Sequence, residues 1–250
     1  MTVVLLHGNP ETPIIWEPLL AELGRTDVVT PNLPGFGCPT PAGFGATKEE
    51  YVDWLLGEIE PLAAQHGPVD FVGHDWGGGI GMRAVSQRPD LFRTWACDVL
   101  GLFHPDYVWH DFAQIWQSPA GEEYFQTQMA TPAEDRVALY EMIGIPRSTG
   151  ERLVAVADDE MSRCILALYR SAAQPAMVQW GAELGHAATL PGLAIIAPND
   201  PFVRSEDLAG EMADRLGASR HVLEGQGHWW MLGDPAGGAA ALRTFWAEAY

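Results

Sequence analysis

The chain has 250 residues, 47 % of them apolar, which is enough to bury the core of one large domain or of one domain with an insertion. It carries 33 acidic and 14 basic residues, and the resulting formal charge of −19 repels phosphate backbones and anionic lipid surfaces. We therefore expect no nucleic-acid partner and no membrane partner.

Cysteine spacing and the start of the chain narrow the class of protein further. Cys38, Cys97 and Cys164 are scattered and form no Cys-x-x-Cys pair, which predicts neither a disulfide framework nor a zinc site. No spacing of His, Asp and Glu suggests another metal site. Residues 1–6 are apolar, but they are too few for a signal peptide or a membrane span. We interpret them as a first strand and expect a cytoplasmic protein.

Short apolar strands alternate with helical segments along the chain, a pattern that is typical of a parallel sheet with helices on both faces. The first helix is expected near Trp16. A second begins at Thr47, because Thr47 and Glu50 form a capping box before an apolar helical stripe. A third is expected over residues 77–87. The predicted strands are 3–6, 27–30, 70–73, 94–100, 193–197 and 220–223.

The alternation stops over residues 103–188, where helical segments rich in large aromatic side chains take over. We interpret this region as a helical cap inserted into a core formed by residues 1–102 and 189–250. Such a cap would cover the carboxyl ends of the strands and enclose a pocket. The aromatic walls predict a small apolar substrate.

The most informative stretch is residues 69–78, where a strand runs into a Gly-x-Asp-x-Gly turn with Asp75 at its centre. This is the pattern of a nucleophile elbow, which pushes the central side chain out of the sheet beside backbone N–H groups. Gly73 and Gly77 are expected where a side chain would collide with the turn or the following helix. A carboxylate that attacks an ester carbonyl gives an anhydride that easily reverts, whereas attack on a saturated carbon gives a stable ester. The elbow therefore indicates cleavage of a carbon–halogen bond or of an epoxide.

Three motifs occur in order: His-Gly-Asn-Pro at residues 7–10, Gly-His-Asp-Trp-Gly-Gly at residues 73–78 and Gly-His-Trp at residues 227–229. Together they resemble the α/β-hydrolase superfamily, on its haloalkane dehalogenase and epoxide hydrolase branch. The resemblance implies an α/β-hydrolase fold with an inserted cap. Because the first motif begins at residue 7, we expect a shortened, mainly parallel sheet of about six strands. The family usually has two further strands before this motif. Without them, one edge of the sheet is exposed or lies at an interface, which allows a homodimer.

The resemblance also implies catalytic roles. Asp75 would be the nucleophile and His228 the general base. Asp200, just after the fifth strand, would be the acid that orients His228, and Asp98, near the end of the fourth strand, is the alternative. The implied chemistry needs water, and no metal or organic cofactor.

The leaving group separates two enzyme classes. The Asn9 side-chain amide and the Trp76 indole N–H resemble the donors that bind halide, and Asn9 favours a haloalkane dehalogenase. The backbone N–H groups of Asn9 and Trp76 would hold the oxyanion. Tyr169 resembles one of two cap tyrosines that protonate an epoxide oxygen, but Phe112 stands where the other is expected. Epoxide hydrolysis is therefore the alternative. A further alternative is a catalytically idle hydrolase fold that only binds a ligand.

Overall fold

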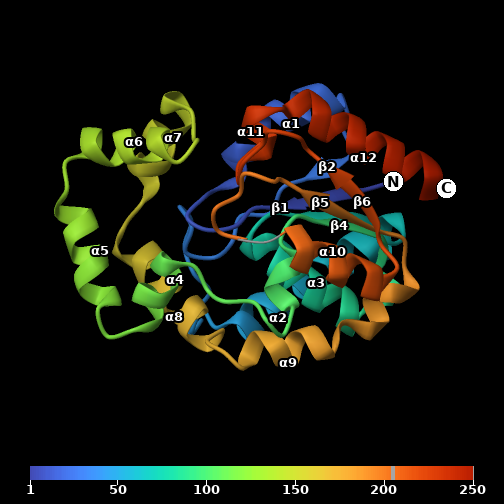
Figure 1. Cartoon of the computed structure of the whole chain (residues 1–250), viewed down its shortest axis with the longest axis horizontal. Helices are drawn as coiled ribbons and strands as arrows, with labels where there is room; N and C mark the ends of the chain where they lie inside the picture. Colours follow the sequence, from blue (N-terminus) through green and yellow to red (C-terminus); the bar gives the residue numbers. More distant parts are fainter. Residues whose placement is uncertain (204–205, 250) are drawn as a thin grey trace.

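A computed structural model describes residues 1–203 and 206–249 (Figure 1). Its described residues form one sheet of six parallel strands in the order β2-β1-β3-β4-β5-β6. This confirms the prediction of about six parallel strands. The strands are β1 (Val3–Leu6), β2 (Val28–Val29), β3 (Val69–Gly73), β4 (Phe92–Cys97), β5 (Gly192–Ile196) and β6 (Ser219–Val222).

Strand β2 is shorter than predicted and β4 ends earlier, whereas β3, β5 and β6 differ by no more than one residue at either end. Edge strand β2 has two residues instead of four, because only Val28 and Val29 pair with β1. The predicted strand 94–100 is wrong at its end, since β4 stops at Cys97 and a buried 3₁₀ helix, η3 (Leu100–Phe103), follows. A short apolar run does not distinguish a buried strand from a buried helical turn, which accounts for the error.

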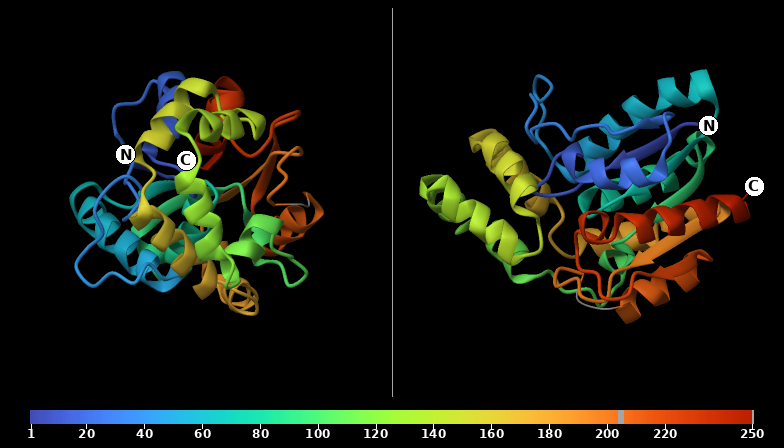
Figure 2. Two further views of the ribbon diagram at one scale, coloured as in Figure 1. Left: turned by 90° about the vertical axis from the view of Figure 1, so that its left-hand side faces the viewer. Right: turned by 90° about the horizontal axis from the view of Figure 1, so that it is seen from above.

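Helices cover both faces of the sheet (Figures 1 and 2). One face is covered by α1 (Glu17–Leu23), α11 (Trp230–Gly233) and α12 (Pro235–Ala249), and the other by α2 (Lys48–His66), α3 (Trp76–Gln87) and α10 (Glu206–Leu216). The 3₁₀ turns η1 (Pro13–Trp16) and η2 (Pro89–Leu91) precede α1 and follow α3. The sheet is therefore buried on both sides, as its continuous apolar strands require.

The start of α2 confirms a local prediction. The Thr47 hydroxyl accepts a hydrogen bond from the Glu50 backbone N–H at 3.3 Å, and the Glu50 carboxylate accepts one from the Thr47 N–H at 3.0 Å. This reciprocal pair is the predicted capping box. It fixes the first turn of the helix that packs beside α3.

Most of the segment between β4 and β5 is helical and lies beyond the carboxyl ends of the strands, away from both termini (Figures 1 and 2). Its last part, residues 176–189, instead runs back below the core and packs against α3 (Figure 1). The exact limits of the cap, residues 103 and 188, stay a prediction. Its helices are α4 (Asp111–Gln117), α5 (Gly121–Ala130), α6 (Ala133–Met142), α7 (Arg147–Val156), α8 (Asp159–Ser171), α9 (Ala176–Ala182) and η4 (Leu184–Thr189).

Two general properties complete the description. The cysteines Cys38, Cys97 and Cys164 are free thiols. Within residues 1–203 and 206–249, every helix is too short or too polar to cross a lipid bilayer.

Candidate active site

The turn between β3 and α3 holds Asp75 in a strained backbone conformation. Its φ of 48° and ψ of −126° lie in a region that residues other than glycine rarely adopt. A Cβ on Gly73 would lie 2.5 Å from the Gly78 Cα, and one on Gly77 would lie 2.1 Å from the Leu6 carbonyl oxygen. Both glycines are therefore required, as predicted, and the turn presents the Asp75 side chain above the sheet.

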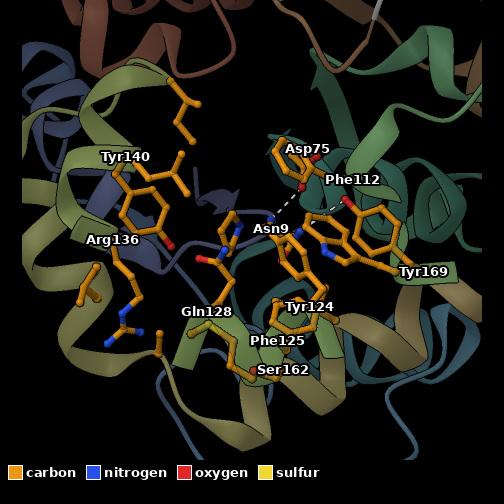
Figure 3. Close-up of a pocket in the computed structure, with 18 of the residues that line it drawn as sticks. Asn9, Asp75, Phe112, Tyr124, Phe125, Gln128, Arg136, Tyr140, Ser162 and Tyr169 are labelled. Atoms are coloured by element: carbon orange, nitrogen blue, oxygen red, sulfur yellow. Dashed lines mark hydrogen bonds between the residues drawn. The ribbon is translucent and has the colours of Figure 1, made fainter. Parts of the chain in front are cut away.

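The loop after β1 lies directly against Asp75. The Asn9 backbone N–H donates to Asp75 Oδ1 at 2.7 Å (Figure 3). A Cβ on Gly8 would lie 2.3 Å from the same oxygen, so only glycine allows the loop to approach this closely. β1 and β3 are neighbours in the sheet, and their parallel pairing places these two loops side by side.

His228 and Asp200 come from the loops after β6 and β5. His228 Nε2 lies 3.8 Å from Asp75 Oδ2, and His228 Nδ1 lies 2.7 Å from Asp200 Oδ2. Asp200 Oδ1 accepts the backbone N–H groups of Phe202 and Val203 at 2.7 and 3.2 Å. The carboxylate is therefore fixed from both sides, and it holds the imidazole with Nε2 facing Asp75.

Asp98 is placed differently. Its Oδ1 accepts the Asp75 backbone N–H at 3.1 Å, while its Oδ2 bonds to His74 Nδ1 at 2.5 Å and to the Trp230 indole N–H at 2.7 Å. Among the described residues, the carboxylate within 4.0 Å of His228 Nδ1 is that of Asp200. The alternative pairing of Asp98 with His228 is thus absent here, and Asp98 supports the elbow instead.

Sequence reasoning missed Glu11, which is fully buried beneath the site. Its Oε2 accepts the Gly8 backbone N–H at 3.1 Å, and its Oε1 contacts His74 Nε2 at 3.1 Å and accepts the Trp229 indole N–H. A charged residue within the otherwise uncharged and mainly apolar stretch 10–16 was the available signal.

His74 joins Glu11 to Asp98. Burial opposes protonation of the imidazole, but the Asp98 and Glu11 carboxylates outweigh it and raise the pKa of His74 well above its usual value. A cation between two carboxylates thus ties together the loops after β1, β3 and β4. Glu11, His74 and His228 also place possible metal-ligand atoms within 4.8 Å of one another, but Glu11 and His74 already bond to each other there.

The ionisation of the central residues follows from burial and neighbouring charge. Burial raises the pKa of Asp75 to about 6, against the opposing effect of His228. For His228, burial favours the neutral ring, but the Asp200 carboxylate prevails and raises the pKa above its ordinary value. For Asp200, burial is outweighed by the attraction of His228, and its pKa is lowered. Asp75 is therefore a buried carboxylate of increased basicity.

Asp75 opens into a cavity of about 130 Å³ between the sheet and the cap (Figure 3). Tyr169 of α8 enters it, where its phenol oxygen accepts the Asn9 side-chain N–H at 3.4 Å and its ring packs edge-on against Trp76, with the ring centroids 5.4 Å apart. Asn9 and Trp76, the two predicted halide donors, thus both contact Tyr169. Phe112 also lines the cavity, as do Trp116, Tyr124, Phe125, Leu139 and Ile165.

The comparison with known sequences identifies the superfamily. Residues 3–241 match the sequence profile of the alpha/beta hydrolase family. The chain belongs to this family. Its α/β-hydrolase fold is thereby confirmed, and so is the resemblance on which the sequence prediction depends.

Several relatives of this α/β hydrolase are haloalkane dehalogenases. One from Psychrobacter cryohalolentis is 35 % identical over 36 % of this chain and only 30 % of the relative. One from Bradyrhizobium diazoefficiens is 26 % identical over 89 % of this chain and 81 % of the relative. A crystal structure of a haloalkane dehalogenase loop variant from Bradyrhizobium elkanii superposes with a TM-score of 0.75 at 22 % identity, covering 99 % of this chain and 91 % of the other. At that identity, the superposition shows a shared fold.

Proposed function

We propose that this α/β hydrolase cleaves the carbon–halogen bond of a small haloalkane through an ester of Asp75. The observation that carries the proposal is the position of Asp75 in the elbow, with one carboxylate oxygen bonded to the Asn9 N–H and the other facing His228. A carboxylate oxygen attacks the halogen-bearing carbon, a C–O bond forms, and halide leaves with the bonding electrons. The Asn9 amide and the Trp76 indole are the donors proposed to hold the halide.

In the second step His228 takes a proton from water, and the resulting hydroxide attacks the carbonyl carbon of the Asp75 ester. The Asn9 and Trp76 backbone N–H groups stabilise the oxyanion, a contribution worth about 10²- to 10³-fold in rate in other hydrolases. Collapse of this intermediate releases the alcohol, which takes the proton back from His228. Asp75 is left as a carboxylic acid and loses one proton to solvent, which restores its carboxylate, and Asp200 stabilises the transient imidazolium.

Ester formation itself prepares His228 for this role. In the free enzyme the Asp75 carboxylate contributes to the raised pKa of His228. The ester carries no charge, so the pKa of His228 falls once the alkyl group is attached. This change favours the neutral imidazole, which is the form that can accept a proton in the second step.

The raised pKa of Asp75 gives a testable pH dependence. The nucleophile must be ionised, and burial raises the pKa of Asp75 to about 6. We expect kcat/KM for bromide release to be constant well above pH 6 and to fall about tenfold per unit below it. A profile measured between pH 4.5 and 9 in buffers of constant ionic strength tests this. Full activity at pH 4.5 would contradict it.

Epoxide hydrolysis is the second candidate, and the position of Tyr169 favours it. Because its oxygen accepts a hydrogen bond from the Asn9 amide, its own O–H is left to donate to a bound ligand. Asp75 would attack a ring carbon, the C–O bond of the epoxide would break, and Tyr169 would protonate the oxygen. Hydrolysis of the ester would then release a diol.

Two substitutions separate the candidates. For a dehalogenase, Asn9→Ala removes a halide donor and is expected to slow bromide release far more than Tyr169→Phe. For an epoxide hydrolase, Tyr169→Phe removes the proton donor and is expected to cost about 10²- to 10⁴-fold in diol formation. Tyr124→Phe is the control, since Tyr124 lines the same cavity and its ring packs against Phe112 and Trp116.

The assay compares 1-bromobutane, 1,2-dibromoethane and styrene oxide, with bromide and diol as the products measured. Diol formation without bromide release would overturn the dehalogenase proposal. If the protein turns over none of these compounds but another ligand raises its melting temperature, the result would favour a catalytically idle fold that only binds a ligand. A cytoplasmic location and a homodimer stay predictions from the sequence.

A further inference from the structure

The cavity has a polar end. Figure 3 shows Arg136 and Tyr140 of α6, with Gln128 of α5, on the side opposite Asp75 and Tyr169. Between the two ends the lining is mainly apolar, with Phe125, Leu139 and Ile165 among its members. A ligand that fills the cavity would therefore meet Asp75 at one end, apolar walls along its length and hydrogen-bond donors at the other end.

Arg136 lacks the partner that an arginine in this protein usually has. Among the described residues, no carboxylate lies within 4.0 Å of its guanidinium, although acidic residues outnumber basic ones 33 to 14. Its Nε is buried without a hydrogen-bond partner, and Nη1 contacts only the weak acceptor Met129 Sδ, at 3.7 Å. By contrast, the other cap arginines are paired with glutamates: Arg147, Arg152, Arg163 and Arg170.

Two further donors share this end of the cavity. Neither the Tyr140 hydroxyl nor the Gln128 amide has a hydrogen-bond partner in the part of the chain that the structure describes. Burial raises the pKa of Tyr140, so the phenol keeps its proton and can donate. Asp158 also lines the cavity, but its Oδ1 caps α8 by accepting the Met161 N–H at 2.8 Å. Among the donors at this end, Arg136 Nε is the one that is buried without an acceptor in the described residues, and such a donor is costly unless a ligand supplies the acceptor.

We propose that Arg136, Tyr140 and Gln128 bind the carboxylate of a substrate whose reacting carbon lies at Asp75. A guanidinium matches a carboxylate through two parallel N–H···O bonds, and the phenol and amide can donate to the remaining lone pairs. The apolar walls fit the alkyl chain between the two ends. The substrate class is therefore a haloalkanoate with its halogen at the far end of the chain. The choice of halogen depends on the proposed function, whereas the carboxylate site does not.

The kinetic test compares 6-bromohexanoate with the neutral 6-bromohexanamide. We expect kcat/KM to favour the acid by about 10- to 100-fold, the usual range for hydrogen bonds to a charged group. In Arg136→Gln this ratio is expected to fall to about one. Arg147→Gln, which alters a paired and exposed cap arginine, is the matched control and is expected to keep the wild-type ratio.

A binding test separates this site from the reaction. In the Asp75→Ala background, hexanoate is expected to raise the melting temperature, and 1-hexanol to raise it less. Adding Arg136→Gln is expected to remove the difference. If neither bromide substrate reacts but hexanoate still stabilises through Arg136, the proposed function fails and the carboxylate site stands. Equal kcat/KM values for acid and amide, with no hexanoate effect that depends on Arg136, would overturn the site.

Discussion

Asp75→Ala is expected to reduce bromide release by at least about 10⁴-fold, the scale of loss seen when a nucleophile is removed from a hydrolase. The covalent step uses the carboxylate itself, and the methyl group of alanine cannot replace it. The measurement is bromide release at saturating substrate, together with the melting temperature to show that the variant is folded.

Asp135→Ala is a suitable control, because Asp135 is an exposed carboxylate of the cap helix α6. It is expected to leave bromide release unchanged. Retention of more than a tenth of the activity by Asp75→Ala would mean that another group attacks the substrate or that water attacks it directly.

His228→Gln is expected to separate the two chemical steps. Alkylation of Asp75 needs no base, so one equivalent of bromide should be released rapidly. Hydrolysis of the ester needs a proton acceptor, which glutamine is not, so steady-state turnover should then fall by about 10²- to 10⁴-fold. Rapid-quench measurement of bromide with enzyme in excess detects the first turnover.

His66→Gln provides the matched control, since His66 is exposed at the end of α2. It should turn over like the wild type. If His228→Gln also loses the first equivalent of bromide, then His228 acts before or during carbon–halogen cleavage, and the proposed order of steps is wrong.

Local patterns predicted the part of the site that depends on strand ends. The elbow could be located because Asp75 lies between a glycine that ends a strand, Gly73, and a glycine in the first turn of a helix, Gly77. The loops containing Asn9, Asp200 and His228 follow β1, β5 and β6, and parallel strands bring such loops to one edge of the sheet. Their proximity therefore follows from the alternation of strands and helices.

Sequence spacing did not distinguish the partners of the two buried histidines. Asp98 and Asp200 both follow strands, so each was a candidate to orient His228. In the structure Asp98 bonds to His74, the residue beside the nucleophile, while Asp200 bonds to His228. The choice depends on side-chain direction and on charges buried nearby, including that of Glu11, and none of these has a local sequence pattern.

The polar end of the cavity was equally hidden. Arg136 lies on α6, where arginine is common on a solvated helix face, and the aromatic content of the cap predicted an apolar pocket. Only the packing of α5 and α6 over the cavity reveals that Arg136 lacks a carboxylate partner there. Contacts between distant segments are the information that periodicity cannot supply.

The central claim, that Asp75 forms an ester with the substrate, is tested most directly by intact-protein and peptide mass spectrometry of His228→Gln. The variant is incubated with whichever of 1-bromobutane, 1,2-dibromoethane and styrene oxide the wild type turns over. We predict one added substrate group per chain, located on the peptide that contains Asp75 and absent from the Asp75→Ala, His228→Gln double variant. An unmodified chain after release of product in the first turnover would contradict the account.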